Sequence, residues 1–160
     1  MSEIIVRVAD LRIGRADDVL VTIGLGSCVA IVLYDAMVQV GGLAHVLLPS
    51  PALSRGSPNP ARVPQTAVPA LLSGMASAGA SPRRIKARLV GGASMFAALA
   101  TPGTIQMGER NIVAARQALA AAGLPIIGEA VGGDFGRTVR LHVRDGRLDV
   151  TSVMHGSVAL

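Results

Sequence analysis

Residues 19–34 read VLVTIGLGSCVAIVLY, an uncharged stretch in which aliphatic runs stand on either side of a glycine- and serine-containing break. Short apolar runs rich in β-branched residues are typical of buried strands, and Gly-Ser clusters mark turns. We therefore expect a buried strand–turn–strand, with strands over Val19–Ile23 and Cys28–Tyr34.

The neighbouring sequence extends this pattern in both directions. Upstream, Ile4–Ile13 alternates loosely and predicts a strand that is interrupted near Ala9-Asp10. Downstream, Asp35–Gln39 predicts a turn and Val40–Leu48 a returning strand, so that residues 28–48 form a hairpin. Gly41-Gly42 inside the returning strand indicates a bulge or a close approach of another part of the chain.

The second half of the chain adds helices and further strands. Apolar spacing and closing glycines predict helices over Gln65–Ala78 and Glu109–Ala122. Alternation or short apolar runs predict strands over Ile85–Val90, Ile126–Val131, Arg137–Val143 and Leu148–Val153, the last two joined at Asp145-Gly146. Strands outnumber helices and turns join most of them, so we expect one α+β domain over residues 1–160, with a largely antiparallel core over 4–153.

Composition excludes several classes of function. Aromatic residues make up 2% of the 160 residues, which argues against a stacking platform for nucleic acid. The formal charge is +5, but the arginines are scattered and Arg83-Arg84-Ile85-Lys86 is too short a cluster to indicate nucleic-acid binding. The N-terminus lacks the pattern of a signal peptide, and no apolar run approaches the roughly 20 residues of a membrane helix. We expect a cytoplasmic protein without direct membrane insertion.

Cys28 is the single cysteine, which rules out an internal disulfide and a cysteine-rich zinc site and suits a reducing compartment. It follows Gly24-Leu25-Gly26-Ser27, where glycines allow a sharp turn and let backbone N–H groups point at a reacting carbonyl oxygen. Cys28 therefore fits a nucleophile with Gly26 and Ser27 as backbone support. A small buried core residue is the alternative.

His45 is the candidate base. If the hairpin closes between Ala36 and Met37, Cys28 and His45 lie directly opposite each other, with Cβ atoms about 4.5–5.5 Å apart. Such a pair suits a thiolate–imidazolium couple, in which the imidazolium lowers the thiol pKa. A third group usually orients the histidine, and Thr22 on the preceding strand has a hydroxyl for this. An ordinary core histidine and an ordinary strand threonine are the alternatives.

The remaining candidates are weaker. His142 and His155 are too dispersed to make a metal motif, so we expect no metal site. Gly91-Gly92-Ala93-Ser94 lacks the ending of a phosphate loop, and we expect it to pack tightly or to shape the site. Pro49–Pro64 is rich in proline and serine and predicts a long loop of the kind that forms lids or binding loops.

Five blocks of the sequence together resemble the chemoreceptor glutamine deamidase family CheD. They are Thr22–Ala30, Gly41–Pro49, Gly91–Phe96, Gly108–Asn111, and Val131-Gly132-Gly133 followed by Gly136-Arg137. The resemblance runs from about Ile4 to Val150. It implies a β-sandwich-like core flanked by helices and a Cys–His–Thr triad at Cys28, His45 and Thr22, with no cofactor.

The resemblance also implies a function and partners. Glutamine side chains on the cytoplasmic domains of methyl-accepting chemoreceptors would become glutamates, in bacterial chemotaxis adaptation and through a cysteine thioester. A CheC-like phosphatase is a possible partner. Two alternatives stay open: a non-catalytic regulatory partner of such a phosphatase, and a receptor methylesterase that uses the same thiol.

The chain departs from this family where the first helix begins. Val63-Pro64-Gln65 stands in place of the family's usual Tyr-Ala-Asp-like stretch. Gln65 and Thr66 are therefore candidates for contact with the substrate, and residues 49–65 for the choice of substrate.

Overall fold

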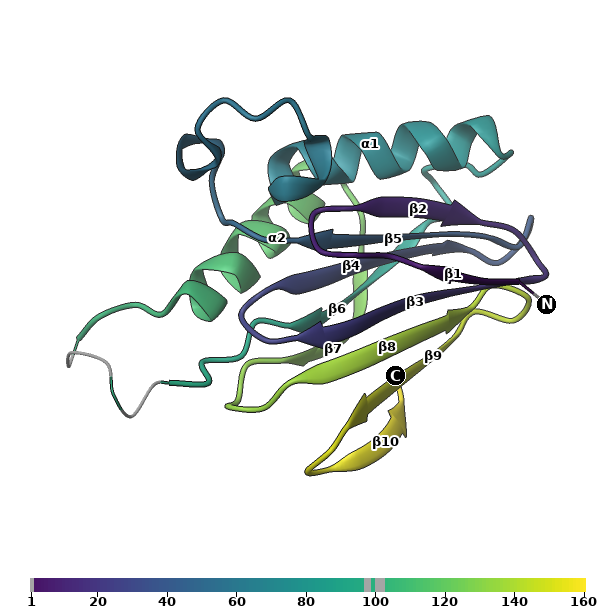
Figure 1. Cartoon of the computed structure of the whole chain (residues 1–160). Coiled ribbons are helices and arrows are strands. Elements are labelled where there is room, and N and C mark those ends of the chain that lie inside the picture. Colours follow the sequence, from purple (N-terminus) through teal and green to yellow (C-terminus); the bar gives the residue numbers. More distant parts are fainter. Residues whose placement is uncertain (1, 97–98, 100–102) are drawn as a thin grey trace.

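Two five-stranded sheets face each other in the computed structural model, and two helices cover the outer face of one sheet (Figure 1). The structure describes residues 2–96, 99 and 103–160. The first sheet has the order β1-β3-β8-β9-β10, with β1 Ser2–Ile5, β3 Asp18–Leu25, β8 Arg137–His142, β9 Arg147–Ser152 and β10 Gly156–Ala159. The second has the order β2-β5-β4-β6-β7, with β2 Leu11–Gly14, β5 Val40–Val46, β4 Val29–Asp35, β6 Lys86–Gly91 and β7 Ile126–Val131.

The second sheet is the middle layer of the molecule. Helices α1 (Pro64–Ser77) and α2 (Met107–Ala121) pack against β2, β4, β5 and β6 on one side, and the first sheet covers the other. Both faces of β4 and β5 are consequently buried, which explains why these strands read as continuous apolar runs. One apolar cluster, centred on Ile31, Leu71 and Leu89, fills the space below the helices, and another, centred on Leu20, Leu43 and Leu141, fills the space between the sheets.

The expected fold class is confirmed. Among the described residues, six of eight strand pairings are antiparallel, and only β1–β3 and β6–β7 are parallel. No described helix combines the length and the apolarity that a membrane span requires.

Three local expectations differ from the structure. The strand expected over residues 4–13 breaks at Ala9, which has a φ of 58°, and its two halves join different sheets as β1 and β2. The loop after β5 contains two short 3₁₀ helices, η1 (Pro51–Ser54) and η2 (Pro60–Arg62), each capped by a side-chain oxygen. β10 was not expected, because its residues are exposed and lack apolar alternation.

The register of the β4–β5 hairpin also differs from the expected one. His45 pairs with Ala30, not with Cys28, because the turn closes between Met37 and Val38. The expected direct opposition of Cys28 and His45 is therefore wrong by two residues. A shift of two keeps a side chain on the same face of a sheet, so Cys28 is still a diagonal neighbour of His45.

The two glycines of β5 allow close packing and do not form a bulge. Pairing runs without interruption from Val29–Val46 to Asp35–Val40. A Cβ atom on Gly41 would stand 2.8 Å from Leu141 Cδ2, and one on Gly42 would stand 3.0 Å from Leu71 Cδ2. Gly41 thus lets the first sheet approach, and Gly42 lets α1 approach.

This packing predicts a specific coupling between Gly41 and Leu141. Gly41→Ala overpacks the space between the sheets and should destabilise the protein by about 1–3 kcal/mol. Leu141→Ala leaves a cavity and should cost about 2–5 kcal/mol. In the double variant the new methyl group enters the space that Leu141 vacates. The destabilisation of the double variant should therefore be smaller than the sum of the two single destabilisations by at least about 0.5 kcal/mol. Urea unfolding of all four proteins measures this, and strict additivity would contradict it.

Candidate active site

Thr22 and His45 meet between the two sheets. Thr22 lies on β3 of the first sheet with none of its surface exposed, and His45 lies on β5 of the second sheet with 1% exposed. Thr22 Oγ1 lies 2.7 Å from His45 Nδ1 and donates to the carbonyl oxygen of Val6 at 2.6 Å. The segment between β1 and β2 closes over this contact, because His45 N donates to Asp10 O and Ala9 N donates to His45 O.

These contacts fix the tautomer of the imidazole. A threonine hydroxyl has one proton, and here that proton goes to Val6 O. Thr22 Oγ1 must therefore accept the bond from His45, so Nδ1 bears the hydrogen and Nε2 bears the lone pair in the neutral ring. His45 Nε2 is buried and has no hydrogen-bond partner within the described part of the chain. It is the ring nitrogen that is left to take a proton.

Cys28 lies just before β4 and is partly buried against the cluster between the sheets. The register places it diagonally to His45 on the same face of the second sheet. Its thiol does not hydrogen-bond His45 Nε2 in this structure. The structure thus brings Thr22 and His45 into contact and places Cys28 next to them; catalytic contacts of this kind often tighten only when substrate is bound.

Burial favours the neutral forms of both groups. It lowers the pKa of His45 to about 4, since a charged imidazolium loses its hydration between the sheets. Burial likewise raises the pKa of Cys28, and the N–H of Cys28 itself, close to its own Sγ, offsets only part of that rise. The resting site is therefore a thiol beside a neutral imidazole, which differs from the expected thiolate–imidazolium couple.

Two backbone N–H groups of the segment after β6 bind the carbonyl oxygens of the residues on either side of Ser27. Gly26 O accepts from Ala93 N, and Cys28 O accepts from Gly92 N, each at 2.8 Å. Within the described chain, Ser27 N and Cys28 N donate no backbone hydrogen bond. Backbone N–H groups without an acceptor beside a thiol are the kind of donor that can stabilise an oxyanion.

The glycines at residues 91 and 92 make this close approach possible. Gly91 has a φ of 109°, and a Cβ atom there would stand 2.3 Å from Cys28 O. Gly92 has a φ of 69°, and its Cβ would stand 2.3 Å from Ile112 Cγ1. The expectation that this segment packs tightly is confirmed.

Asn111 lies beside the candidate site, and the sequence named it only as the end of the Gly108–Asn111 block. It lies in α2 with none of its surface exposed, and its Nδ2 donates to Ser27 O at 2.9 Å and to Leu47 O at 3.2 Å. A polar residue at an apolar position of a helix, beside Ile112, was the available signal.

The two candidates for substrate contact, Gln65 and Thr66, lie in the first turn of α1. Gln65 Nε2 donates to Pro49 O, and Thr66 Oγ1 donates to Pro60 O. Both side chains therefore bind the backbone of the loop between β5 and α1. The same loop is held near the end of β5, because Leu47 N and Leu48 N donate to Arg62 O. The structure gives these residues a role in shaping the loop, and substrate contact stays a prediction.

The other two histidines lie away from this site. His142 contacts Asp149 Oδ2 at 3.0 Å, and exposed His155 packs on the ring of Phe135. No group of three His, Cys, Asp or Glu side chains that could hold a metal ion occurs among the described residues.

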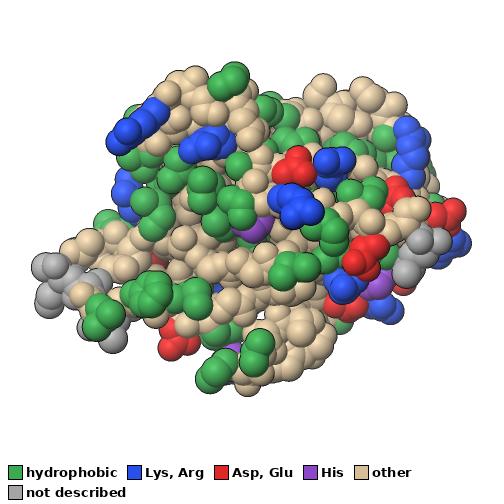
Figure 2. Space-filling model, in the orientation of Figure 1, with side chains coloured by type: hydrophobic (Ala, Val, Ile, Leu, Met, Phe, Trp, Pro, Cys, Tyr) green, Lys and Arg blue, Asp and Glu red, His purple; other side chains and the backbone are tan. Residues whose placement is uncertain are grey.

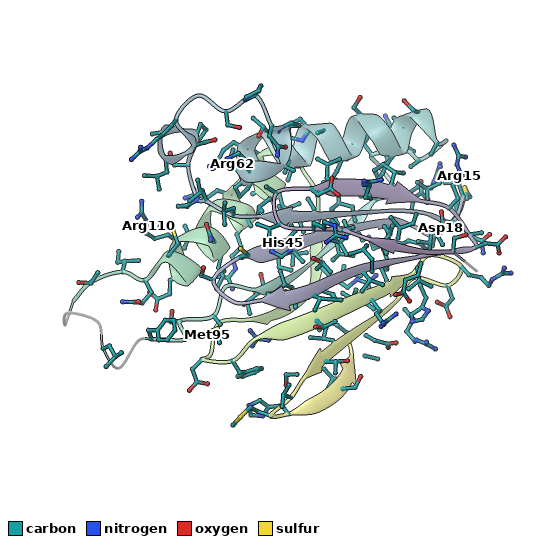
Figure 3. All side chains as sticks on the ribbon, in the orientation of Figure 1. Arg15, Asp18, His45, Arg62, Met95 and Arg110 are labelled. Carbon is teal, nitrogen blue, oxygen red and sulfur yellow. The ribbon has the colours of Figure 1, made fainter. Side chains whose placement is uncertain are left out.

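The surface around the site mixes apolar and basic side chains. His45 lies between the sheets, with Met95, Arg62 and Arg110 toward the end of the molecule that carries the long loops (Figure 3). Hydrophobic side chains gather on the same side of the space-filling view (Figure 2). Met95 is 50% exposed and Phe96 is 74% exposed, and both line a hollow of about 380 Å³ beside Ser27.

Comparison with known proteins gives consistent matches. Residues 47–152 match the family model described as CheD chemotactic sensory transduction. A protein of Caldanaerobacter subterraneus named probable chemoreceptor glutamine deamidase CheD is 39% identical over 151 residues, which cover 94% of this chain and 93% of the relative. One of the same name from Desulfitobacterium hafniense is 39% identical and covers 98% of both chains. One from Geobacter metallireducens, named CheD 2, is 40% identical and covers 96% of both.

The depressed pKa of His45 predicts a loss of stability in acid. In the unfolded chain His45 takes up a proton near pH 6.5, but in the folded protein only near pH 4. The unfolded state therefore binds more protons between these values, and the free energy of unfolding falls as the pH drops. The protonation of His45 should account for about 2 kcal/mol of the fall in the free energy of unfolding between pH 7 and pH 5.

Urea unfolding of the wild type, His45→Gln and His155→Gln at both pH values measures this share. The difference between pH 7 and pH 5 should shrink in His45→Gln and stay unchanged in His155→Gln, the exposed control. An equal pH dependence in all three proteins would show that folded His45 titrates normally.

Proposed function

The chain belongs to the CheD family, and we propose that it hydrolyses the side-chain amide of glutamines on the cytoplasmic domains of methyl-accepting chemoreceptors. The observation that carries this proposal is the bond between Thr22 and His45, which leaves Nε2 unprotonated on the same face of the sheet as Cys28. In this proposal Cys28 is the nucleophile, His45 the base and Thr22 the residue that orients His45.

The first step is attack on the glutamine carbonyl. Because burial favours the neutral pair, the Cys28 thiol passes its proton to His45 Nε2 as the bond from Sγ to the carbonyl carbon forms. Electrons of the carbonyl double bond move to its oxygen. The N–H groups of Ser27 and Cys28, next to Gly26, stabilise that oxyanion; loss of one such donor typically costs about 2.7–4 kcal/mol.

The second step releases ammonia. The imidazolium donates its Nε2 proton to the amide nitrogen while the C–N bond breaks and the carbonyl re-forms, which leaves a thioester on Cys28. A positive charge on His45 is costly between the sheets, so proton transfer to the leaving group is favoured. Thr22 accepts from Nδ1–H throughout and keeps the ring in one orientation.

The third step hydrolyses the thioester. Neutral His45 accepts a proton from water at Nε2 while the water oxygen attacks the thioester carbonyl. Collapse of the second oxyanion breaks the C–S bond, the sulfur takes the proton from Nε2, and glutamate is released. Every step uses side chains of this chain, backbone N–H groups and water.

The charge of the chain suits a receptor partner. The chain has a formal charge of +5, and Arg62 and Arg110 lie on the loop-bearing side of the site (Figure 3). Complementary charge mainly raises the rate of association, so an acidic helical bundle would be captured faster at low salt. A cytoplasmic location follows from this choice of substrate, and Gln65 and Thr66 would then influence which glutamines fit.

The test is conversion of glutamine to glutamate in purified receptor cytoplasmic domains, read by mass spectrometry of tryptic peptides. We expect conversion by the wild type and none by Cys28→Ala. His45→Gln should be slower by about 10²–10⁴-fold, since it lacks general acid–base catalysis. Val153→Ala, at a fully exposed position on the β9–β10 turn, serves as the matched control and should act like the wild type.

The same assay separates the alternatives. Release of methanol from methylated receptor without release of ammonia would favour an esterase that uses the same thiol. No conversion by the wild type, or full conversion by Cys28→Ala, would reject the deamidase. Tight binding of a CheC-type phosphatase without any conversion would favour the regulatory role.

A further inference from the structure

Asn111 connects the two chain segments that carry the candidate reacting groups. Its carboxamide is buried, and one nitrogen, Nδ2, donates to both Ser27 O and Leu47 O. Ser27 directly precedes Cys28. Leu47 follows the end of β5, two residues after His45, and lies one position beyond Val29–Val46, the last pair of the hairpin.

The bond to Ser27 O sets the direction of the next N–H group. The described chain contains no cis peptide bond, so the Ser27–Cys28 peptide is planar and trans, and its C=O and N–H point in opposite directions. Since Ser27 O points at α2, Cys28 N–H points away from α2. That N–H belongs to the same residue as Sγ, the atom that attacks in the proposed reaction. An oxygen on a carbon bonded to Sγ would lie within its reach.

The neighbouring carbonyls are held by different donors. Gly26 O and Cys28 O accept from backbone N–H groups of the segment after β6, whereas Ser27 O accepts from Asn111. Of three consecutive carbonyls, only the middle one depends on a side chain. A single substitution at Asn111 can therefore release this peptide while its neighbours stay held.

The oxygen of the Asn111 amide has no partner, which indicates that the two N–H donors of the amide are what this position requires. Asn111 Oδ1 is buried and has no hydrogen-bond partner among the described residues. An unsatisfied buried acceptor is costly, so an apolar side chain would be favoured if filling space were enough. An amide supplies two N–H donors from one nitrogen, which matches the two carbonyls that it binds.

We propose that Asn111 is a positioning residue that orients the Ser27–Cys28 peptide, so that Cys28 N–H points at the oxyanion formed on the substrate amide. The proposal rests on the proposed deamidase function. It assigns Asn111 no contact with the substrate.

Two variants and two reactions test this role. Asn111→Ala removes the side chain, and Asn111→Leu keeps a similar volume with neither a donor nor a charge. Gln117→Ala, at an exposed position on the same helix, is the matched control. For each protein we would measure kcat and KM for receptor deamidation, and separately the rate and pH midpoint of Cys28 alkylation by iodoacetamide. Alkylation consumes the same thiolate but forms no oxyanion.

We expect the substitutions at Asn111 to slow deamidation and to leave alkylation of Cys28 unchanged. Asn111→Ala and Asn111→Leu should lower kcat by about 10²-fold with KM little changed, as for the loss of one oxyanion donor. Their alkylation rate and pH midpoint should match the wild type, and Gln117→Ala should match it in both reactions.

Several results would overturn the proposal. Unchanged kcat in both variants would show that the peptide keeps its orientation without Asn111. A parallel fall in alkylation, or failure of both variants to fold, would assign Asn111 to the thiol environment or to the fold. Absence of deamidation by the wild type would instead reject the proposed function, and this inference with it.

Discussion

The hydrogen bond between Thr22 and His45 links the packing of this protein to its proposed chemistry. It joins a strand of one sheet to a strand of the other, at a depth where neither residue is exposed to an appreciable extent. Its geometry requires that the sheets pack at a fixed separation, which Gly41 permits by admitting Leu141. Because Thr22 also donates to Val6 O, the same bond decides which nitrogen of His45 is free to accept a proton.

Burial gives this site a different character from an exposed cysteine–histidine couple. Water solvates a thiolate and an imidazolium, and the space between the sheets does not, so the pKa of Cys28 is raised and that of His45 is lowered. A raised pKa leaves less of the thiol as thiolate, which is the reactive form. In the proposed reaction the substrate supplies a carbonyl whose developing charge the backbone N–H groups beside Cys28 stabilise.

Much of this arrangement could be predicted from the sequence, because most strands and both helices carry strong apolar patterns. The period of two placed Cys28 and His45 on one face even though the expected register was wrong by two residues. The turn from Asp35 to Gln39 did not show where the hairpin would close, so direct opposition could not be distinguished from a diagonal. β10 could not be predicted in the same way, since an exposed edge strand leaves no local pattern. The polar residue Asn111 at a buried helix position was visible in the sequence, but its partner was not, because the two residues are 84 positions apart.

The most direct test of this account is the protonation of His45 in the resting protein. Nitrogen-15 NMR of the imidazole distinguishes a protonated nitrogen from a bare one. The account predicts that at pH 7 His45 is neutral, with hydrogen on Nδ1 and a lone pair on Nε2, and that it takes up a second proton only near pH 4. An imidazolium at pH 7, or a neutral ring with hydrogen on Nε2, would contradict it.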